Sequence, residues 1–257
     1  MVPLYGRSRT QTASSCESRR CPALSDQFGS PDLALALIHL CAPTYLQLRE
    51  REHPPAELLG VAPVFADERT RGRPVYFCDV IVRRGSSAKS FWDLKDGAWA
   101  YSDPCSLSGY GGLAARLGSP ERTGPFFGRM IQSGSHPASV RLVADGGADA
   151  ASIDSNVLRL LLERTPALRD EVRLLESWGP YPIQPVVVRT DLDPALKVAL
   201  RKSLIGTEDD PLTRLELEAF GLRRFAEVGE EDYDAGRLPQ TVTRTLRSSP
   251  QRTYLPK

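Results

Sequence analysis

Apolar runs of strand length alternate with amphipathic segments through the middle of the chain. The clearest run, VYFCDVIVRR at 75–84, is rich in β-branched and aromatic residues and lies between Pro74 and Gly85, which is typical of a β-strand. Further strands are expected at 31–40, 57–66, 98–103, 126–136, 148–153, 171–178 and 183–190. Helices are expected at 44–51, 113–119, 137–147, 155–166, 193–205 and 210–222, with a short helical turn at 90–97. This β-α-β-α-β order predicts an α/β fold with mostly parallel strands beneath helices.

Composition narrows the class of protein. Of the 257 residues 41% are hydrophobic and 25% charged, with a net charge of +1, which is ordinary for a folded soluble domain. No basic run suggests nucleic-acid binding, and no apolar stretch reaches the roughly 18 residues of a membrane span. Residues 1–30 are polar and without periodicity, so they are interpreted as a disordered tail. They contain no apolar segment of a secretory signal, and the chain as written is therefore expected to be cytoplasmic.

The five cysteines have no metal-type spacing, and their odd number argues against a disulfide framework. No metal site and no cofactor are therefore expected. The segment YSDPCSLSGYGG at 101–112 matches neither a dinucleotide fingerprint nor a P-loop, so nucleotide binding has little support.

The same segment is the first candidate site. Ser106 or Ser108 is placed to cap a helix by accepting hydrogen bonds from its free backbone amides. Those amides, at the positive end of the helix dipole, also suit an anion, and Gly109 allows a ligand to approach the backbone closely. A plain helix cap and an anion site both remain open for this segment.

Two further turns repeat the arrangement. Ser133-Gly134-Ser135-His136 joins a strand to a helix, and Asp154 lies between a small-residue strand and a helix. Asp154 is either an N-cap or an acceptor for a protonated oxygen or an amine of the ligand. In parallel α/β sheets, ligands bind at the edge where strands end and helices begin. The three turns therefore predict one anion-binding site.

A catalytic interpretation uses the same residues. Ser106 or Cys105 as nucleophile, His136 as base and Asp154 as its orienting acid would form a triad. No G-x-S-x-G turn surrounds the serine, so a covalent hydrolase is the weaker hypothesis.

Three quoted segments together resemble a known family. FWDLKDGAWAYSDPCSLSGY, FFGRMIQSGSHPASVRLVADGGADAASIDS and VVVRTDLDPALKVALRKSLI are similar to the phosphate, phosphite and phosphonate binding proteins of ABC importers, over about Pro31 to Tyr233. The resemblance implies a two-lobed type 2 periplasmic-binding-protein fold. It divides the chain into lobe one at 31–85 and 182–257 and lobe two at 86–181, with crossing strands at 79–85 and 183–191. Because the polar tail replaces the opening strand, helix and strand of the family, lobe one is expected to be incomplete.

The resemblance also implies the site and its partners. A small oxyanion would lie between the lobes, and an ABC permease would receive it from a protein that is not an enzyme and is a monomer. The implied ligand-binding residues are Tyr45 and Tyr76 of lobe one, Ser106, Ser108, Gly109 and Tyr110, then Ser133, Ser135, His136 and Asp154. Protonation of His136 would tune affinity near neutral pH, and Asp154 would select a ligand that carries a proton or an amine. An enzyme on the same fold and a cytoplasmic ligand sensor are the alternatives.

Overall fold

The structure is a computed structural model of the whole chain, and it describes residues 37–118, 122–234 and 238. The predicted tail at 1–30 lies outside the described residues. The strands are β1 Leu37–His39, β2 Ala56–Leu58, β3 Val61–Phe65, β4 Val75–Arg83, β5 Ala98–Tyr101, β6 Arg129–Gln132, β7 Ala150–Asp154, β8 Val172–Pro182, β9 Val186–Arg189 and β10 Leu222–Glu227. The helices are α2 Ala42–Arg49, α3 Gly112–Leu117, α4 Thr123–Phe126, α5 His136–Ala144, α6 Ser155–Arg164, α7 Leu168–Glu171, α8 Pro194–Ile205 and α9 Pro211–Glu218. Short helical turns are η2 Glu68–Thr70, η3 Phe91–Leu94, η4 Leu107–Gly111, η6 Gly206–Glu208 and η7 Glu230–Tyr233.

A five-stranded sheet in the order β6-β5-β7-β4-β8 is the largest sheet of the described chain. Its β6, β5 and β7 strands are parallel, whereas β4 pairs antiparallel with both β7 and β8. Alternate residues of β4 serve its two faces: Val80 and Val82 pack with α3 and an aromatic cluster, and Ile81 packs with α5, α6 and α7. The sheet is therefore covered on both sides, which explains why β7 is buried at every position.

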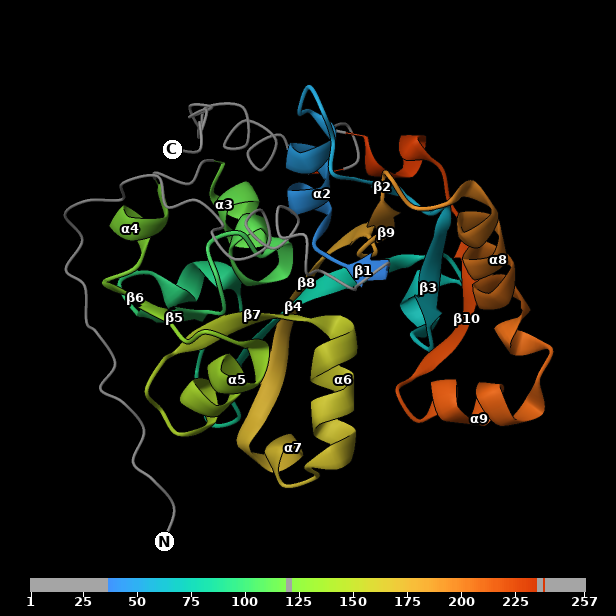
Figure 1. Cartoon of the computed structure of the whole chain (residues 1–257). Helices are drawn as coiled ribbons and strands as arrows, with labels where there is room; N and C mark the ends of the chain where they lie inside the picture. The colour runs from blue at the N-terminus through green and yellow to red at the C-terminus, as the bar shows by residue number, and fades with distance from the viewer. Residues whose placement is uncertain (1–36, 119–121, 235–237, 239–257) are drawn as a thin grey trace, which may run out of the picture.

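The other half of the molecule contains two small sheets, β1-β9-β2 and β10-β3, whose pairs are all antiparallel. Parallel pairing, predicted for most strands, is thus confined to β6-β5-β7 in the described chain. In Figure 1 the long strands β4 and β8 run from this half into the five-stranded sheet. The α/β architecture predicted from the sequence is confirmed.

Three local differences from the sequence prediction have physical causes. The expected strand at 57–66 is two strands, because Gly60 has a φ of 79° and turns the chain between β2 and β3. The strand expected to end at 178 continues to Pro182, since it stays paired with β4 across two register shifts. Strand β10 was not predicted from its sequence, LRRFAE, and is held in place by pairing with β3.

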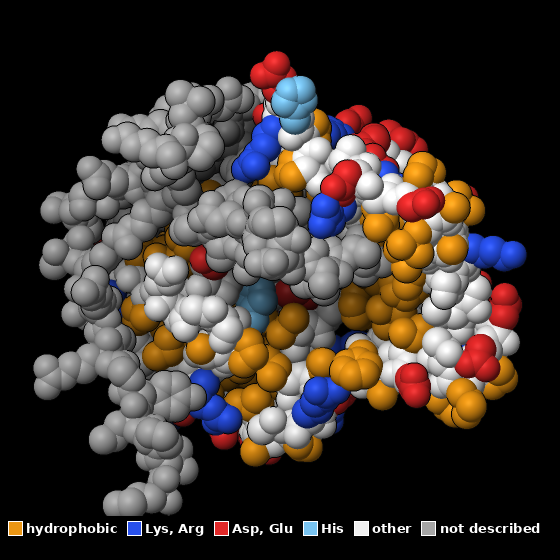
Figure 2. Space-filling view, viewed as in Figure 1, with side chains coloured by type: hydrophobic (Ala, Val, Ile, Leu, Met, Phe, Trp, Pro, Cys, Tyr) orange, Lys and Arg blue, Asp and Glu red, His pale blue; other side chains and the backbone are white. Residues whose placement is uncertain are grey.

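Helices α8 and α9 have no buried residues. In Figure 2 hydrophobic side chains gather on the surface over these two helices, on the right of the view. The exposed apolar residues there are Leu196, Val198, Leu212, Leu215 and Phe220.

Candidate functional site

The site begins at η4, which follows the Asp-Pro turn after β5. The hydroxyl oxygen of Ser106 caps this turn by accepting the amide of Gly109 at 3.0 Å. A Cβ at Gly109 would collide with the Ser102 hydroxyl, so only glycine fits there. The Ser102 hydroxyl is buried and has no hydrogen-bond partner among the described residues. The space beside the Gly109 backbone, which the sequence assigned to a ligand, is therefore occupied by the hydroxyl of Ser102.

Ser108 lies at the centre of a buried group of hydroxyl and imidazole side chains. Its Oγ is 3.1 Å from Nε2 of His136, the first residue of α5. The Tyr76 hydroxyl, from β4, lies near enough to the Ser108 side chain for that side chain to lower its pKa, against the larger raising effect of burial. Ser152 of β7 donates a hydrogen bond to the Ser108 carbonyl oxygen. Residues that the sequence placed on three separate elements therefore meet at one point.

His136 meets this group through Nε2, and its other ring nitrogen points elsewhere. Its Nδ1 is buried and has no hydrogen-bond partner among the described residues. Burial lowers the pKa of His136 from 6.5 to about 4, so the ring is neutral at pH 7. Burial therefore acts against titration of the ring near neutral pH, and the tuning of affinity by His136 protonation stays a prediction.

The depressed pKa of His136 predicts a loss of stability in acid. Below pH 6.5 the unfolded chain binds a proton that the folded chain does not accept until about pH 4. Wild type should therefore lose about 1.4 kcal/mol per pH unit, relative to His136→Gln, as pH falls through this window. Urea unfolding of both proteins at pH 7, 6 and 5 measures the difference. The same substitution at exposed His53 is the control, and a constant gap between wild type and His136→Gln would contradict the prediction.

Asp154 lies at the carboxyl end of β7 and caps α6, as the sequence suggested. Its Oδ1 accepts the amides of Asn156 at 2.8 Å and Val157 at 3.3 Å. Its Oδ2 accepts the side-chain amide of Gln184 at 2.7 Å. The residue is only 3% exposed, and burial raises the pKa of its carboxyl group. Asp154 does not contact His136 in the manner of a triad, because its carboxylate is engaged by α6 and Gln184.

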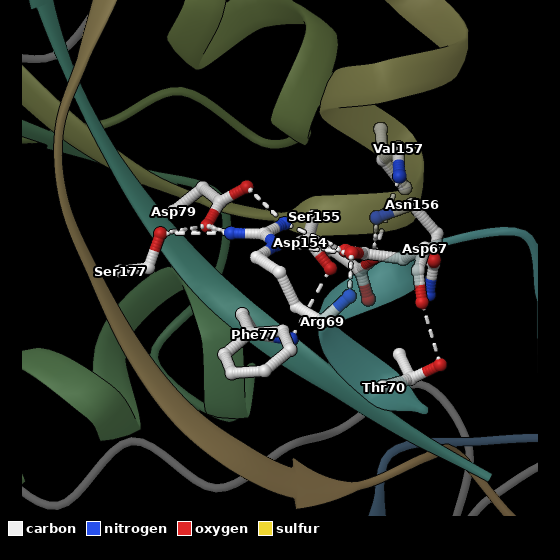
Figure 3. A network of polar contacts seen from close by, with 10 residues as sticks. All are labelled: Asp67, Arg69, Thr70, Phe77, Asp79, Asp154, Ser155, Asn156, Val157 and Ser177. Atoms are coloured by element: carbon white, nitrogen blue, oxygen red, sulfur yellow. Dashed lines mark hydrogen bonds and ion pairs between the residues drawn. The ribbon is translucent and has the colours of Figure 1, made fainter. Parts of the chain in front are cut away.

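A partly buried ion network lies beside Asp154, as Figure 3 shows. Arg69 of η2 donates to both oxygens of Asp79, at 2.9 and 3.0 Å, and to Asp67. Ser177 of β8 donates to Asp79 at 2.6 Å. The Arg69 guanidinium also lies 4.6 Å from the ring centre of Phe77. The network fixes β4 against β8 and against the loop after β3.

Four predicted residues use their side chains elsewhere. The Tyr45 hydroxyl donates to Glu230 at 2.5 Å, and the Tyr110 hydroxyl is 3.0 Å from that of Thr123. Ser133 donates to backbone oxygens of its own turn and to its neighbour strand, while Ser135 caps α5 by accepting the amide of Ala138. The structure thus brings Tyr76, Ser108 and His136 together, with Asp154 near Tyr76.

Leu107, between the two serines, packs away from the polar group. It is 1% exposed and belongs to a hydrophobic cluster with Leu40, Ala42 and Tyr45. In the described chain the other buried members of this cluster all lie at 40–76 and 183–238. The backbone amide of Leu107 faces the Cys41 thiol, whose pKa is raised by burial. The turn that carries Ser106 and Ser108 is therefore anchored in the opposite half of the molecule.

Sequence analysis missed Gln184, Cys41 and Ser152. Each lies far along the chain from the residue that it contacts, so no local motif marks it. One weak signal exists for Gln184, which is a single polar residue within the apolar run YPIQPVVV. Cys105 is disulfide-bonded, whereas Cys41 and Cys78 are free thiols. A disulfide is thus present despite the odd number of cysteines.

Two features are absent from the described residues. In that part of the chain, no group of three or more histidine, cysteine, aspartate or glutamate side chains is arranged to hold a metal ion. Among the same residues, no helix combines the length and the apolar character that crossing a bilayer requires.

Comparison with known proteins places these features in a family. A family model described as the periplasmic substrate-binding protein of a phosphonate ABC transporter matches residues 35–233. A binding-protein component of a phosphonate ABC transporter from Pseudomonas aeruginosa has a TM-score of 0.70 and 20% identity, over 82% of this chain and 70% of its own. PhnD1 from Prochlorococcus marinus, solved with methylphosphonate, has a TM-score of 0.66 and 18% identity, over 84% and 79% of the two chains. A Xanthomonas citri protein bound to chloride has a TM-score of 0.61 and 20% identity, over 83% and 77%.

These structures share the type 2 periplasmic-binding-protein fold with the chain, as the sequence resemblance implied. Since the family model covers more than half of the 257 residues, the chain belongs to the family of periplasmic substrate-binding proteins of phosphonate ABC transporters.

Proposed function

We propose that this protein binds a phosphonate-like oxyanion beside η4 and α5 and delivers it to an ABC permease. The observation that carries the proposal is the buried contact of Ser108 with His136, whose Nδ1 is unpartnered among the described residues. Buried polar groups are normally hydrogen bonded, so the unpartnered Nδ1, which is not the nitrogen that meets Ser108, indicates a place for a ligand atom at the same ring. The Prochlorococcus relative, which shares the fold, was solved with methylphosphonate.

Neutral donors make up this site. Hydroxyl groups and an imidazole hydrogen bond an oxyanion without a full counter-charge. Asp154 lies close enough to raise the pKa values of Tyr76 and Cys41, after the larger effect of burial on each. The same negative charge disfavours a doubly ionised ligand, so a singly charged phosphonate fits better than a dianion.

The site favours binding over catalysis. A nucleophilic serine needs a base whose second nitrogen is oriented by an acceptor, and Asp154 is committed to Gln184 and α6 instead. The family is one of transport proteins. We therefore propose that the protein is not an enzyme, and that it acts as a monomer.

We also propose a location outside the cytoplasm, in place of the cytoplasmic location that the composition of the first 30 residues suggested. The family is periplasmic, and Cys105 is disulfide-bonded. Disulfides persist in oxidising compartments and are rare in the cytosol. A cytoplasmic sensor with the same site is the alternative, and the redox state of Cys105 in cells, measured by thiol alkylation, separates the two.

Removing the Ser108 hydroxyl should weaken methylphosphonate binding by about tenfold or more, because a hydrogen bond to a charged group contributes about 1.5–3 kcal/mol. Titration calorimetry of wild type and Ser108→Ala measures the effect. Ser87→Ala, at an exposed serine after β4, is the matched control and should keep wild-type affinity. Wild type that binds no phosphonate would contradict the proposed function. Equal affinity of Ser108→Ala and the control would contradict the place of the site.

A further inference from the structure

The carboxylate of Asp154 is already engaged on both oxygens. Two amides of α6 occupy Oδ1, and the side-chain amide of Gln184 occupies Oδ2 at 2.7 Å. A carboxylate offers about four acceptor positions, so three of them are used within the protein. Because the residue is 3% exposed, the remaining position has little room for a donor from the ligand.

We infer that Gln184 sets the class of ligand, so that this protein takes oxyanions whose organic substituent carries no ammonium group. This inference rests on the function proposed above. An ammonium group has three donors and is costly to bury unless acceptors replace its water. To reach Asp154 it must displace the Gln184 amide, which would then lose its own partner.

Two other carboxylates among the described residues act on this group, but Asp79 is already paired with Arg69, and Asp103 is exposed and accepts the amide of Cys105. Burial raises the pKa values of Tyr76, Cys41 and Cys78 above their ordinary values, so these groups are neutral at pH 7. His136 is neutral as well. An alkyl substituent needs no such acceptor, and the surroundings of Tyr76 belong to a hydrophobic cluster.

The hydrogen bond from Gln184 to Asp154 connects two segments that lie far apart in the sequence. Gln184 lies two residues after the end of β8, whereas Asp154 ends β7, and 30 positions separate them. The expectation that Asp154 receives an amine of the ligand is therefore replaced by an internal amide that already fills this role.

Two ligands of equal size test the inference. Ethylphosphonate has a terminal methyl group at the place where aminomethylphosphonate has an ammonium group. Titration calorimetry at pH 7 gives the dissociation constant of each ligand. Wild type should favour ethylphosphonate by about tenfold or more. Gln184→Leu removes the competing amide, and the preference should shift toward aminomethylphosphonate by about tenfold.

Gln47→Leu, the same substitution on α2, is the matched control and should keep the wild-type preference. Gln184→Glu is a second variant that adds an acceptor beside Asp154, and it should shift the preference in the same direction as Gln184→Leu. Wild type that binds neither ligand would refute the proposed function. Wild type that binds both ligands equally, or Gln184 variants that keep its preference, would overturn the inference and leave the proposed function standing.

Discussion

Replacing Phe91 by alanine is expected to lower the free energy of unfolding by about 3–5 kcal/mol, the usual cost of truncating a buried aromatic side chain. Phe91 is fully buried at the start of η3. Its ring contacts five other aromatic rings, those of Trp92, Trp99, Phe126, Phe127 and Trp178. These rings connect β5, β8 and the α4 segment, so the cavity would weaken the sheet that carries Ser108 and Asp154. Urea unfolding followed by tryptophan fluorescence measures the loss.

Phe220→Ala is the matched control for this experiment. Phe220 is 57% exposed near the end of α9, and its truncation should change the free energy of unfolding by no more than about 0.5 kcal/mol. Similar losses for the two variants would show that the aromatic cluster does not hold this half of the fold together.

Replacing Arg69 by methionine should cost about 3 kcal/mol, because it leaves a buried carboxylate without its cation. Asp79 is 4% exposed, and Arg69 supplies two of the hydrogen bonds to its oxygens. Part of the Arg69 side chain is exposed, which places the expected loss at the lower end of the range for buried pairs. Thermal and urea unfolding at pH 7 measure it.

A second substitution separates two causes of the expected loss of stability: the missing contacts of Arg69 and the unpaired charge of Asp79. If the cost comes from the unpaired carboxylate of Asp79, Asp79→Asn should recover part of the stability that Arg69→Met loses, since the double variant has no charge at position 79. A double variant less stable than either single variant would show that Arg69 acts mainly through Asp67 and the Phe77 ring.

Local features of the site were predictable because they depend on neighbours in the sequence. Ser106, Ser135 and Asp154 act as helix caps, as a small oxygen-bearing side chain before a helix predicts. The order of strands and helices also followed from the hydrophobic pattern, and with it the edge at which Ser108 and Asp154 lie. The sequence therefore predicted the helix caps correctly, and the ligand-binding roles of the same residues stay a prediction.

Contacts between segments that lie far apart in the sequence could not be predicted from the hydrophobic pattern. Tyr45 was placed in the site by family resemblance, yet its hydroxyl is held by Glu230, 185 positions away. Gln184 reaches Asp154 only because β8 returns antiparallel along β4 and brings the next residues beside the end of β7. Strand β10 was missed for the same reason, since its arginine-rich sequence gains its order from β3.

The burial of Leu107 governs how freely the two halves separate. Its side chain lies among apolar residues of the opposite half while its neighbours Ser106 and Ser108 belong to the polar group. Any motion that carries η4 away from α2 must expose this leucine to water, at a cost of about 2 kcal/mol. The contact therefore favours the arrangement in which the two halves are together over any arrangement in which η4 leaves α2.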